Sequence, residues 1–248
     1  MSAIYILWLR QLKRYSRSRA RMVMSMMQPL MFLAALGMGF SPVFKKAGEG
    51  NYLQFLGPGV IAMSVMFTGV FSGIEILWDR QFGFLKETLV APVSRLQIVF
   101  GRTLGSATVA VFQGLLMLMI CLVAGVRIHS AALLPAAVGF MFLIALFFTS
   151  IGTAVGSLME DMQGFQLVTN VLVMPLFFFS NALFPLAGLS RPLRVLLHAN
   201  PLVYGMDGLR GSLGGTFNQG AGVDVLILGA LTGLVMALAA WLFSRIQL

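Results

Sequence analysis

The feature that most constrains this chain is a series of long segments that contain no Asp, Glu, Lys, Arg or His. A helix crosses the hydrocarbon core of a bilayer with about 20 apolar residues, and each of these segments is long enough to do so. They cover residues 22–44, 50–74, 103–126, 130–159, 162–190 and 225–244. We therefore predict an all-α membrane protein that forms one transmembrane domain over 1–248. Its six transmembrane helices are assigned to 22–44, 50–76, 103–126, 131–158, 163–186 and 224–244.

Composition supports this class. Of 248 residues, 58% are hydrophobic and only 10% are charged, which is too few charges to cover the surface of a water-soluble domain. The single cysteine, Cys121, excludes an intrachain disulfide framework, and His129 and His198 are too few for the usual metal cluster. The net charge of +9 comes from basic residues that flank the apolar segments. An anionic lipid surface therefore explains this charge better than nucleic acid does.

The distribution of Lys and Arg predicts the orientation, because cytoplasmic loops carry an excess of these residues. With the N-terminus in the cytoplasm, the loops on that side hold eleven Lys and Arg, and the opposite loops hold six. No small-residue cleavage site closely follows the first apolar segment, which we interpret as a retained span rather than a signal peptide. We predict a multi-pass protein of the cytoplasmic (inner) membrane with both termini in the cytoplasm.

Residues 1–21 are predicted to form an amphipathic helix in the membrane interface. Its basic stripe, at helical spacing, comprises Arg10, Lys13, Arg14, Arg17 and Arg21. Its opposite face carries Tyr5, Trp8, Leu9 and Leu12. Such a helix places its aromatic side chains among lipid headgroups and its cations toward anionic lipid or solvent. The alternative is a positive-inside stop signal that need not be helical.

A second amphipathic pattern covers residues 78–91, in the loop after the second span. Its apolar stripe comprises Trp78, Phe82, Leu85 and Leu89. Pro92 ends the predicted helix, because the residue before a proline is disfavoured in the α conformation. A short amphipathic helix in a cytoplasmic loop can dock a soluble partner, and the alternative is a solvated connector.

The segment 187–222, between the last two spans, is rich in proline and glycine. Its middle, around residues 193–204, is too apolar for a free loop and too short to cross the bilayer. We predict re-entrant or interfacial helices that cap the bundle on the outer side, with their broken backbone buried in protein. An ordinary interfacial loop is the alternative.

Catalytic motifs are absent from the sequence. It contains no P-loop GxxxxGK[ST], no GxSxG and no HExxH. No carboxylate lies in the middle of a span, which argues against a proton-driven carrier. Glu75, at the inner edge of the second span, is expected to pair with Arg80 or another cation, or to reach the interface. Glu160 and Asp161 are interpreted as a solvated turn.

Two further patterns concern packing. Gly101 with Gly105, and Gly152 with Gly156, permit close helix approach within the chain or across a dimer. The run 177–179 contains three phenylalanines and follows Pro175. It places aromatic side chains around a predicted kink. One or two of them can face a cavity, and lipid-facing packing is the alternative.

The stretch RQFGFLKETLVAPVSR over residues 80–95, followed by Gly101-Arg102, resembles the cytoplasmic loop of ABC-2-type transporter permeases. The segments Phe184-Pro185-Leu186, 200–204 (NPLVY) and 207–210 (DGLR) are similar to the outer segment of the same family. The match extends in order over nearly the whole chain and is nearest to the compact permeases of drug, nodulation-factor and polysaccharide exporters. The chain departs from the family pattern at Gln81 and Phe84, where Glu and Thr are usual.

The resemblance implies the permease subunit of an ATP-driven exporter that moves a hydrophobic or amphiphilic cargo, such as a drug, a lipid or a lipid-linked glycan. Two copies would form a homodimer among membrane lipids and dock two copies of a separate ATP-binding subunit. ATP and Mg²⁺ would bind that partner, and this chain itself would hold no cofactor or metal and would not be an enzyme. The alternatives are an ATP-independent carrier or channel and, less favoured, a membrane-embedded enzyme.

The resemblance also assigns three groups of residues. The coupling helix, 78–91, would contact the ATP-binding subunit through Arg80, Gly83, Phe84, Lys86 and Glu87. The external gate would comprise Phe184, Pro185, Asn200, Pro201, Tyr204 and Arg210. The substrate pathway would include Met174, Phe177, Phe178 and Asn181.

Overall fold

The computed structural model describes residues 3–46, 52–84, 93–183 and 197–246, and every regular element within these ranges is helical. Five helical segments are long and apolar enough to cross a membrane. They lie in α2 (Arg19–Lys46), α3 with α4 (Tyr52–Phe71 and Ile74–Gln81), α6 (Arg95–Val123), α7 (Leu134–Leu158, after the 3-10 turn Ala131–Leu133) and α11 (Ala221–Ser244). The other described helices are α1 (Ala3–Arg17), α8 (Met162–Phe178) and α10 (Pro201–Gly214).

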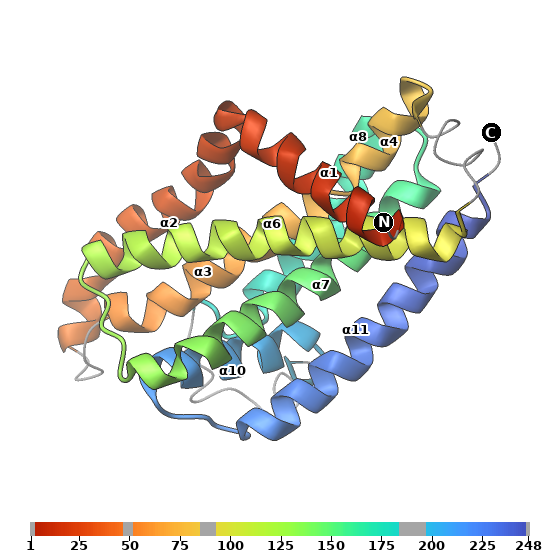
Figure 1. Ribbon diagram of the computed structural model, residues 1–248. Coiled ribbons are helices and arrows are strands. Elements are labelled where there is room, and N and C mark those ends of the chain that lie inside the picture. The colour runs from red at the N-terminus through yellow and green to blue at the C-terminus, as the bar shows by residue number, and fades with distance from the viewer. Residues whose placement is uncertain (1–2, 47–51, 85–92, 184–196, 247–248) are drawn as a thin grey trace.

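Helix α3 forms the centre of the bundle, packed against α2, α6 and α7 (Figure 1). In the apolar window that includes α3, 83% of the residues are buried, compared with 17% in the window of α2. Leu56, Val60 and Val65 of α3 are completely inaccessible. The core therefore forms around α3, and α2 is a peripheral helix that leaves most of its surface exposed.

The second predicted span is interrupted. Helix α3 ends at Phe71, a turn follows at Ser72 and Gly73, and α4 begins at Ile74. Helix α7 crosses this break in backbone contact, since a Cβ on Gly152 would lie 2.2 Å from the carbonyl oxygen of Val70. A Cβ on Gly73 would lie 2.1 Å from the carbonyl oxygen of Gly152. The glycine pair in α7 is thus used within the chain.

Helix α1 lies along the first half of α6 (Figure 1). A Cβ on Gly105 would lie 2.8 Å from Cβ of Gln11, and one on Gly101 would lie 2.9 Å from Cβ of Leu7. These small residues let the two helices approach closely. Trp8 Nε1 also donates a hydrogen bond to Thr108 Oγ1 over 3.1 Å. The second glycine pair therefore holds α1 against the bundle.

Helix α6 begins at Arg95, eight residues before the charge-free segment that predicted it. Ser94 caps this helix, because its Oγ accepts a hydrogen bond from the backbone N–H of Gln97 over 3.3 Å. Arg95 Nη1 donates to the carbonyl oxygen of Ile246 over 3.3 Å. The last described residues therefore lie beside the start of α6, and Figure 1 shows the first described residues at the same end of the bundle.

The fifth predicted span, 163–186, corresponds to a shorter helix. Helix α8 has 17 residues and ends at Phe178. Asp161 caps its start by accepting a hydrogen bond from the N–H of Gly164 over 2.6 Å. Of the predicted outer segment, 187–222, the structure describes residues 197–222. Helix α10 lies in this part and packs against α7 and α11.

Candidate functional site

Asp79, near the end of α4, is the centre of an ion-pair cluster that joins three helices. Its side chain is 3% exposed. Arg102 of α6 lies 2.8 Å from Asp79 and is itself buried, while Arg10 and Arg14 of α1 lie 3.3 and 3.6 Å away. A buried carboxylate requires such partners, because an isolated charge in an apolar interior is costly. The cluster therefore fastens α1 and α6 to α4.

Glu75 lies one helical turn before Asp79 and is 5% exposed. Its Oε2 lies 3.7 Å from Nη1 of Arg14, whose guanidinium also lies 5.5 Å from the ring centroid of Trp78. Arg80 instead lies 3.6 Å from the exposed Glu160. Of the predicted partners for Glu75, "another cation" is therefore observed in place of Arg80.

These contacts correct the prediction for the N-terminal helix. Lys13 and Arg17 are exposed, as expected for cations that face lipid or solvent. Arg10 and Arg14 instead turn toward the buried carboxylates of α4. The pattern of the sequence could not distinguish these directions, because these four residues belong to the same basic stripe.

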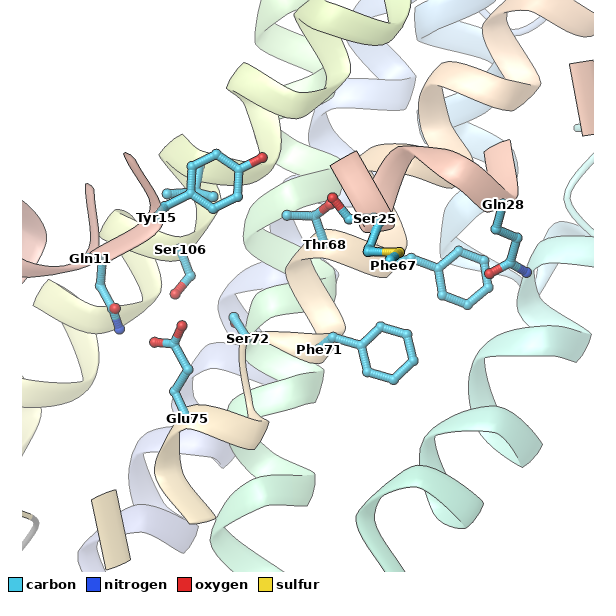
Figure 2. Close-up of a pocket in the computed structure, with 12 residues that line it drawn as sticks. Gln11, Tyr15, Ser25, Gln28, Phe67, Thr68, Phe71, Ser72, Glu75 and Ser106 are labelled. Atoms are coloured by element: carbon cyan, nitrogen blue, oxygen red, sulfur yellow. The ribbon is translucent and has the colours of Figure 1, made fainter. Parts of the chain in front are cut away.

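A cavity of about 320 Å³ adjoins Glu75 between α1, α2, α3, α4 and α6 (Figure 2). Its polar lining side chains are Gln11, Tyr15, Ser25, Gln28, Thr68, Ser72, Glu75 and Ser106. Its apolar lining side chains are Met24, Phe67, Phe71 and Val109. Aromatic and aliphatic side chains with a few convergent polar groups are typical of a ligand pocket.

The predicted coupling segment, 78–91, is not one continuous helix. Helix α4 ends at Gln81, and Gly83 has a φ of 78° in the left-handed region that favours glycine. Phe84 is helical again and half exposed, and Phe82 is 70% exposed. Lys86 and Glu87 lie outside the described residues. Among the predicted contact residues, Arg80 thus lies in the last turn of α4, one residue after Asp79, and Gly83 and Phe84 follow the end of this helix.

At the opposite end, the predicted gate residues lie on α10 or next to it. Asn200 caps α10 through Oδ1, which accepts from the N–H of Leu202 over 3.0 Å, and Pro201 occupies the first turn. The amide nitrogen of Asn200 donates to the carbonyl oxygens of Leu176 and Phe179 over 2.7 and 2.9 Å. Asn200 therefore ties the end of α8 to the start of α10.

Two other predicted gate residues are also held by backbone carbonyls. Tyr204 donates to the carbonyl oxygen of His198 over 2.9 Å. Arg210 donates to the carbonyl oxygen of Asn181 over 2.8 Å, and its guanidinium lies 4.0 Å from the ring centroid of Phe55. Burial lowers the pKa of Arg210 to about 10, against the opposing charge of Asp207. Arg210 remains a cation at neutral pH. Phe184 and Pro185 lie outside the described residues.

The predicted pathway residues do not converge on one described cavity. Phe177 is completely buried in the core, Phe178 is 46% exposed, and Met174 packs partly buried against the core. Asn181 has a positive φ of 66° in the turn after α8. Their role in transport remains a prediction.

Sequence reasoning missed Asp79 and Gln11 as members of a site. The signal was present in the spacing, because Arg10 and Arg14 are four residues apart on one helix, and Glu75 and Asp79 are four apart on another. Side chains at this spacing share a helix face. Matched acidic and basic pairs on two amphipathic helices therefore indicate an ion-paired contact between them.

These features define a polytopic helical membrane protein with a buried ion-pair cluster, centred on Asp79, at one end. Within the described ranges, no three His, Cys, Asp or Glu side chains gather to hold a metal ion. The sequence matches the ABC-2 type transporter family over residues 2–213, and the chain belongs to that family. Permeases of this family work with an ATP-binding subunit.

Individual relatives agree with this assignment. The chain is 28% identical to the transport permease ycf38 of Cyanophora paradoxa over 84% of this chain and 72% of that protein. It is 31% identical to ycf38 of Porphyra purpurea, over 78% and 68% of the two chains. It is also 28% identical to nodulation protein J of Rhizobium leguminosarum bv. trifolii, over 74% and 70%.

Proposed function

We propose that this chain is the permease subunit of an ATP-driven exporter in the cytoplasmic membrane. In this arrangement two copies form the pore, α8 serves as the fifth of six spans, and both ends of the chain lie in the cytoplasm. Two ATP-binding subunits dock on the turn after α4. The cargo is hydrophobic or amphiphilic.

The observation that carries this proposal is the Asp79 cluster, because it sits directly behind the predicted docking turn. Force applied at residues 80–87 reaches α4, and Asp79 joins α4 to Arg102 of α6 and to Arg10 and Arg14 of α1. Helix α4 also follows α3 across a turn of two residues. A push on the turn would therefore move several helices together rather than one loop.

The energy for this movement would come from ATP. A ligand shifts a conformational equilibrium only when it binds the two states with different affinity. ATP closes the two ATP-binding subunits, and their closure favours the permease conformation that releases cargo outward. The permease needs no phosphate-binding motif of its own in this scheme, which fits the absence of a P-loop from its sequence.

The test is to co-express the chain with an ATP-binding subunit from the same genome and to substitute Lys86 and Glu87 together by alanine. We expect the complex to assemble but its permease-dependent ATP hydrolysis to fall at least tenfold. Arg127→Ala removes an exposed cation beyond the far end of α6, away from the turn, and should leave hydrolysis unchanged. Full activity in the Lys86 and Glu87 variant would show that docking occurs elsewhere. Capture of no P-loop partner would favour the carrier or channel.

A further inference from the structure

The cavity beside Glu75 contains polar groups that the protein itself leaves without partners. Gln11 is 8% exposed, and its amide forms no hydrogen bond within the described part of the chain. Ser106 is 7% exposed, and its hydroxyl is likewise unbonded there. Thr68 Oγ1 is buried without a hydrogen-bond partner. Figure 2 shows Gln11 and Ser106 pointing into the same space above Glu75.

Such groups indicate a ligand with matching donors and acceptors. A glutamine amide offers two donors and an acceptor with two lone pairs, and a hydroxyl offers one donor and two lone pairs. Buried polar groups in proteins are normally satisfied, so each one that is not requires an explanation. Here Thr68 Oγ1 of α3 is such a group, and the unbonded side chains of Gln11 of α1 and Ser106 of α6 line the same cavity.

The charges around the cavity favour an uncharged head group. Among the described lining residues, Glu75 is the one Asp, Glu, Lys, Arg or His side chain, and Arg14 lies 3.7 Å from it. An ammonium or sulfate head would add a charge beside carboxylates that already have arginine partners, and a buried charge without its own counter-ion is unfavourable. Hydroxyl groups can bond to Gln11, Ser106 and Thr68 without this penalty.

The remaining walls suit an apolar tail. Phe67 and Phe71 of α3 line the cavity, and Figure 2 shows their rings on the side toward Gln28, away from Gln11 and Ser106. Met24 closes it from α2 and is itself 72% exposed. Methionine is flexible and polarisable and adapts to ligands of varied shape. Because α2 is peripheral, a tail that leaves past Met24 would enter the surrounding lipid directly.

We propose that this cavity binds the hydroxyl-bearing head of an uncharged amphiphile, whose tail extends past Phe67, Phe71 and Met24 into the membrane. Gln11 is the residue that recognises the head. That the bound amphiphile is cargo rests on the proposed exporter function, whereas the binding itself requires neither ATP nor a partner subunit.

The test uses the purified full chain in lipid nanodiscs and an alkyl glucoside with a photoreactive diazirine in its tail. We expect cross-links, located by mass spectrometry, at Met24, Phe67 or Phe71. Unlabelled octyl glucoside should compete, whereas octyltrimethylammonium and octyl sulfate should compete at least tenfold less well. Equal competition by all three would indicate a nonspecific apolar pocket, and preference for octyltrimethylammonium would indicate a cation site at Glu75. Either result would overturn the proposal.

Two variants test the role of the polar groups. Gln11→Leu and, separately, Ser106→Ala should reduce cross-linking at these positions, Gln11→Leu at least tenfold. Gln97→Leu makes the same change at an exposed position on α6 and should leave cross-linking unchanged. Thermal unfolding identifies any variant that fails to fold, in which case the other variant decides. Undiminished cross-linking in a folded variant, or no cross-linking of the native chain, overturns the proposal. These results do not depend on ATP hydrolysis, so they are distinguishable from failure of the exporter hypothesis.

Discussion

Asp79 shows how a single carboxylate can connect elements that are distant in sequence. Arg10, Arg14 and Arg102 all lie within 3.6 Å of its oxygens. Exposed ion pairs contribute little to stability, but a buried charge that loses its partner is strongly destabilising. Arg102 is the buried member of the three, so its pair with Asp79 dominates the energetic effect.

Asp79→Asn should therefore lower the free energy of unfolding by about 3–5 kcal/mol, the usual effect of removing one partner of a buried pair. The measurement is thermal unfolding of the detergent-solubilised protein. Glu160→Gln is the matched control, because Glu160 is 84% exposed although it also faces an arginine, and it should show almost no change. Equal unfolding temperatures for the native chain and Asp79→Asn would contradict the assigned cluster.

Asn200 has a comparable role at the other end of the bundle. Asn200→Ala removes the cap of α10 and both bonds to the carbonyl oxygens at the end of α8. Loss of a cap alone destabilises by about 1 kcal/mol. We expect a total effect of about 2 kcal/mol in the same unfolding assay, with faster proteolysis near residue 179. A variant as stable as the native chain would exclude this tie between α8 and α10.

At the scale of elements, the packing depends on places where helix backbones touch. Helix α7 crosses the break between α3 and α4 at Gly152, where a Cβ would overlap the carbonyl oxygen of Val70. In contrast, a Cβ on Gly139 of the same helix would meet no atom within 4 Å. These two glycines therefore differ in function although both lie in α7.

Gly152→Ala should separate α7 from the break and destabilise the protein by about 1–3 kcal/mol, the usual effect of inserting a methyl group into a packed contact. Gly139→Ala should be neutral or slightly stabilising, since alanine favours a helix more than glycine does. Comparing the two unfolding temperatures provides the measurement. The contact is wrongly assigned if both substitutions have the same effect.

The sequence predicts those parts of the structure that depend on local features, such as the length of a charge-free segment. It does not predict those that depend on a partner helix. Long charge-free runs predicted five segments that are long enough to span, because bilayer thickness fixes their length, whereas the run at 162–190 contains the shorter helix α8. The same criterion placed the start of α6 too late, since Arg102 is charged but buried beside Asp79. It also missed the break before α4, because the turn at Ser72 and Gly73 contains no charge. The direction of Arg10 and Arg14 depends on the partner helix, which local patterns do not specify.

The candidate site was predictable only in part. An ion pair was predictable for Glu75, because a carboxylate at the edge of a span needs a partner. Gln11 and Ser106 carry no such signal, as neutral polar residues are common in helices. Their importance appears only when α1 folds against α6 through Gly105 and brings the two side chains to one cavity.

At the scale of the whole molecule, the bundle has the Asp79 ion-pair cluster at one end. At the other end, side chains next to or on α10 donate hydrogen bonds to backbone carbonyl oxygens. Asp79 connects α1, α4 and α6 behind the predicted docking turn, while Asn200 and Arg210 hold α10 to its neighbours. A movement that begins at the turn after α4 can therefore reach the opposite end of the bundle through α3, because only two residues separate α3 from α4. This arrangement suits a permease whose conformational change is driven by a separate ATP-binding subunit.

The central claim is that work enters this chain from a separate ATP-binding subunit. The direct measurement is transport and ATP hydrolysis in proteoliposomes that contain the purified chain with or without that subunit. We predict that the chain alone neither hydrolyses ATP nor moves an amphiphilic probe down or against an ion gradient, and that both activities appear when the subunit and Mg-ATP are added. Nucleotide turnover or gradient-driven flux by the chain alone would contradict the claim.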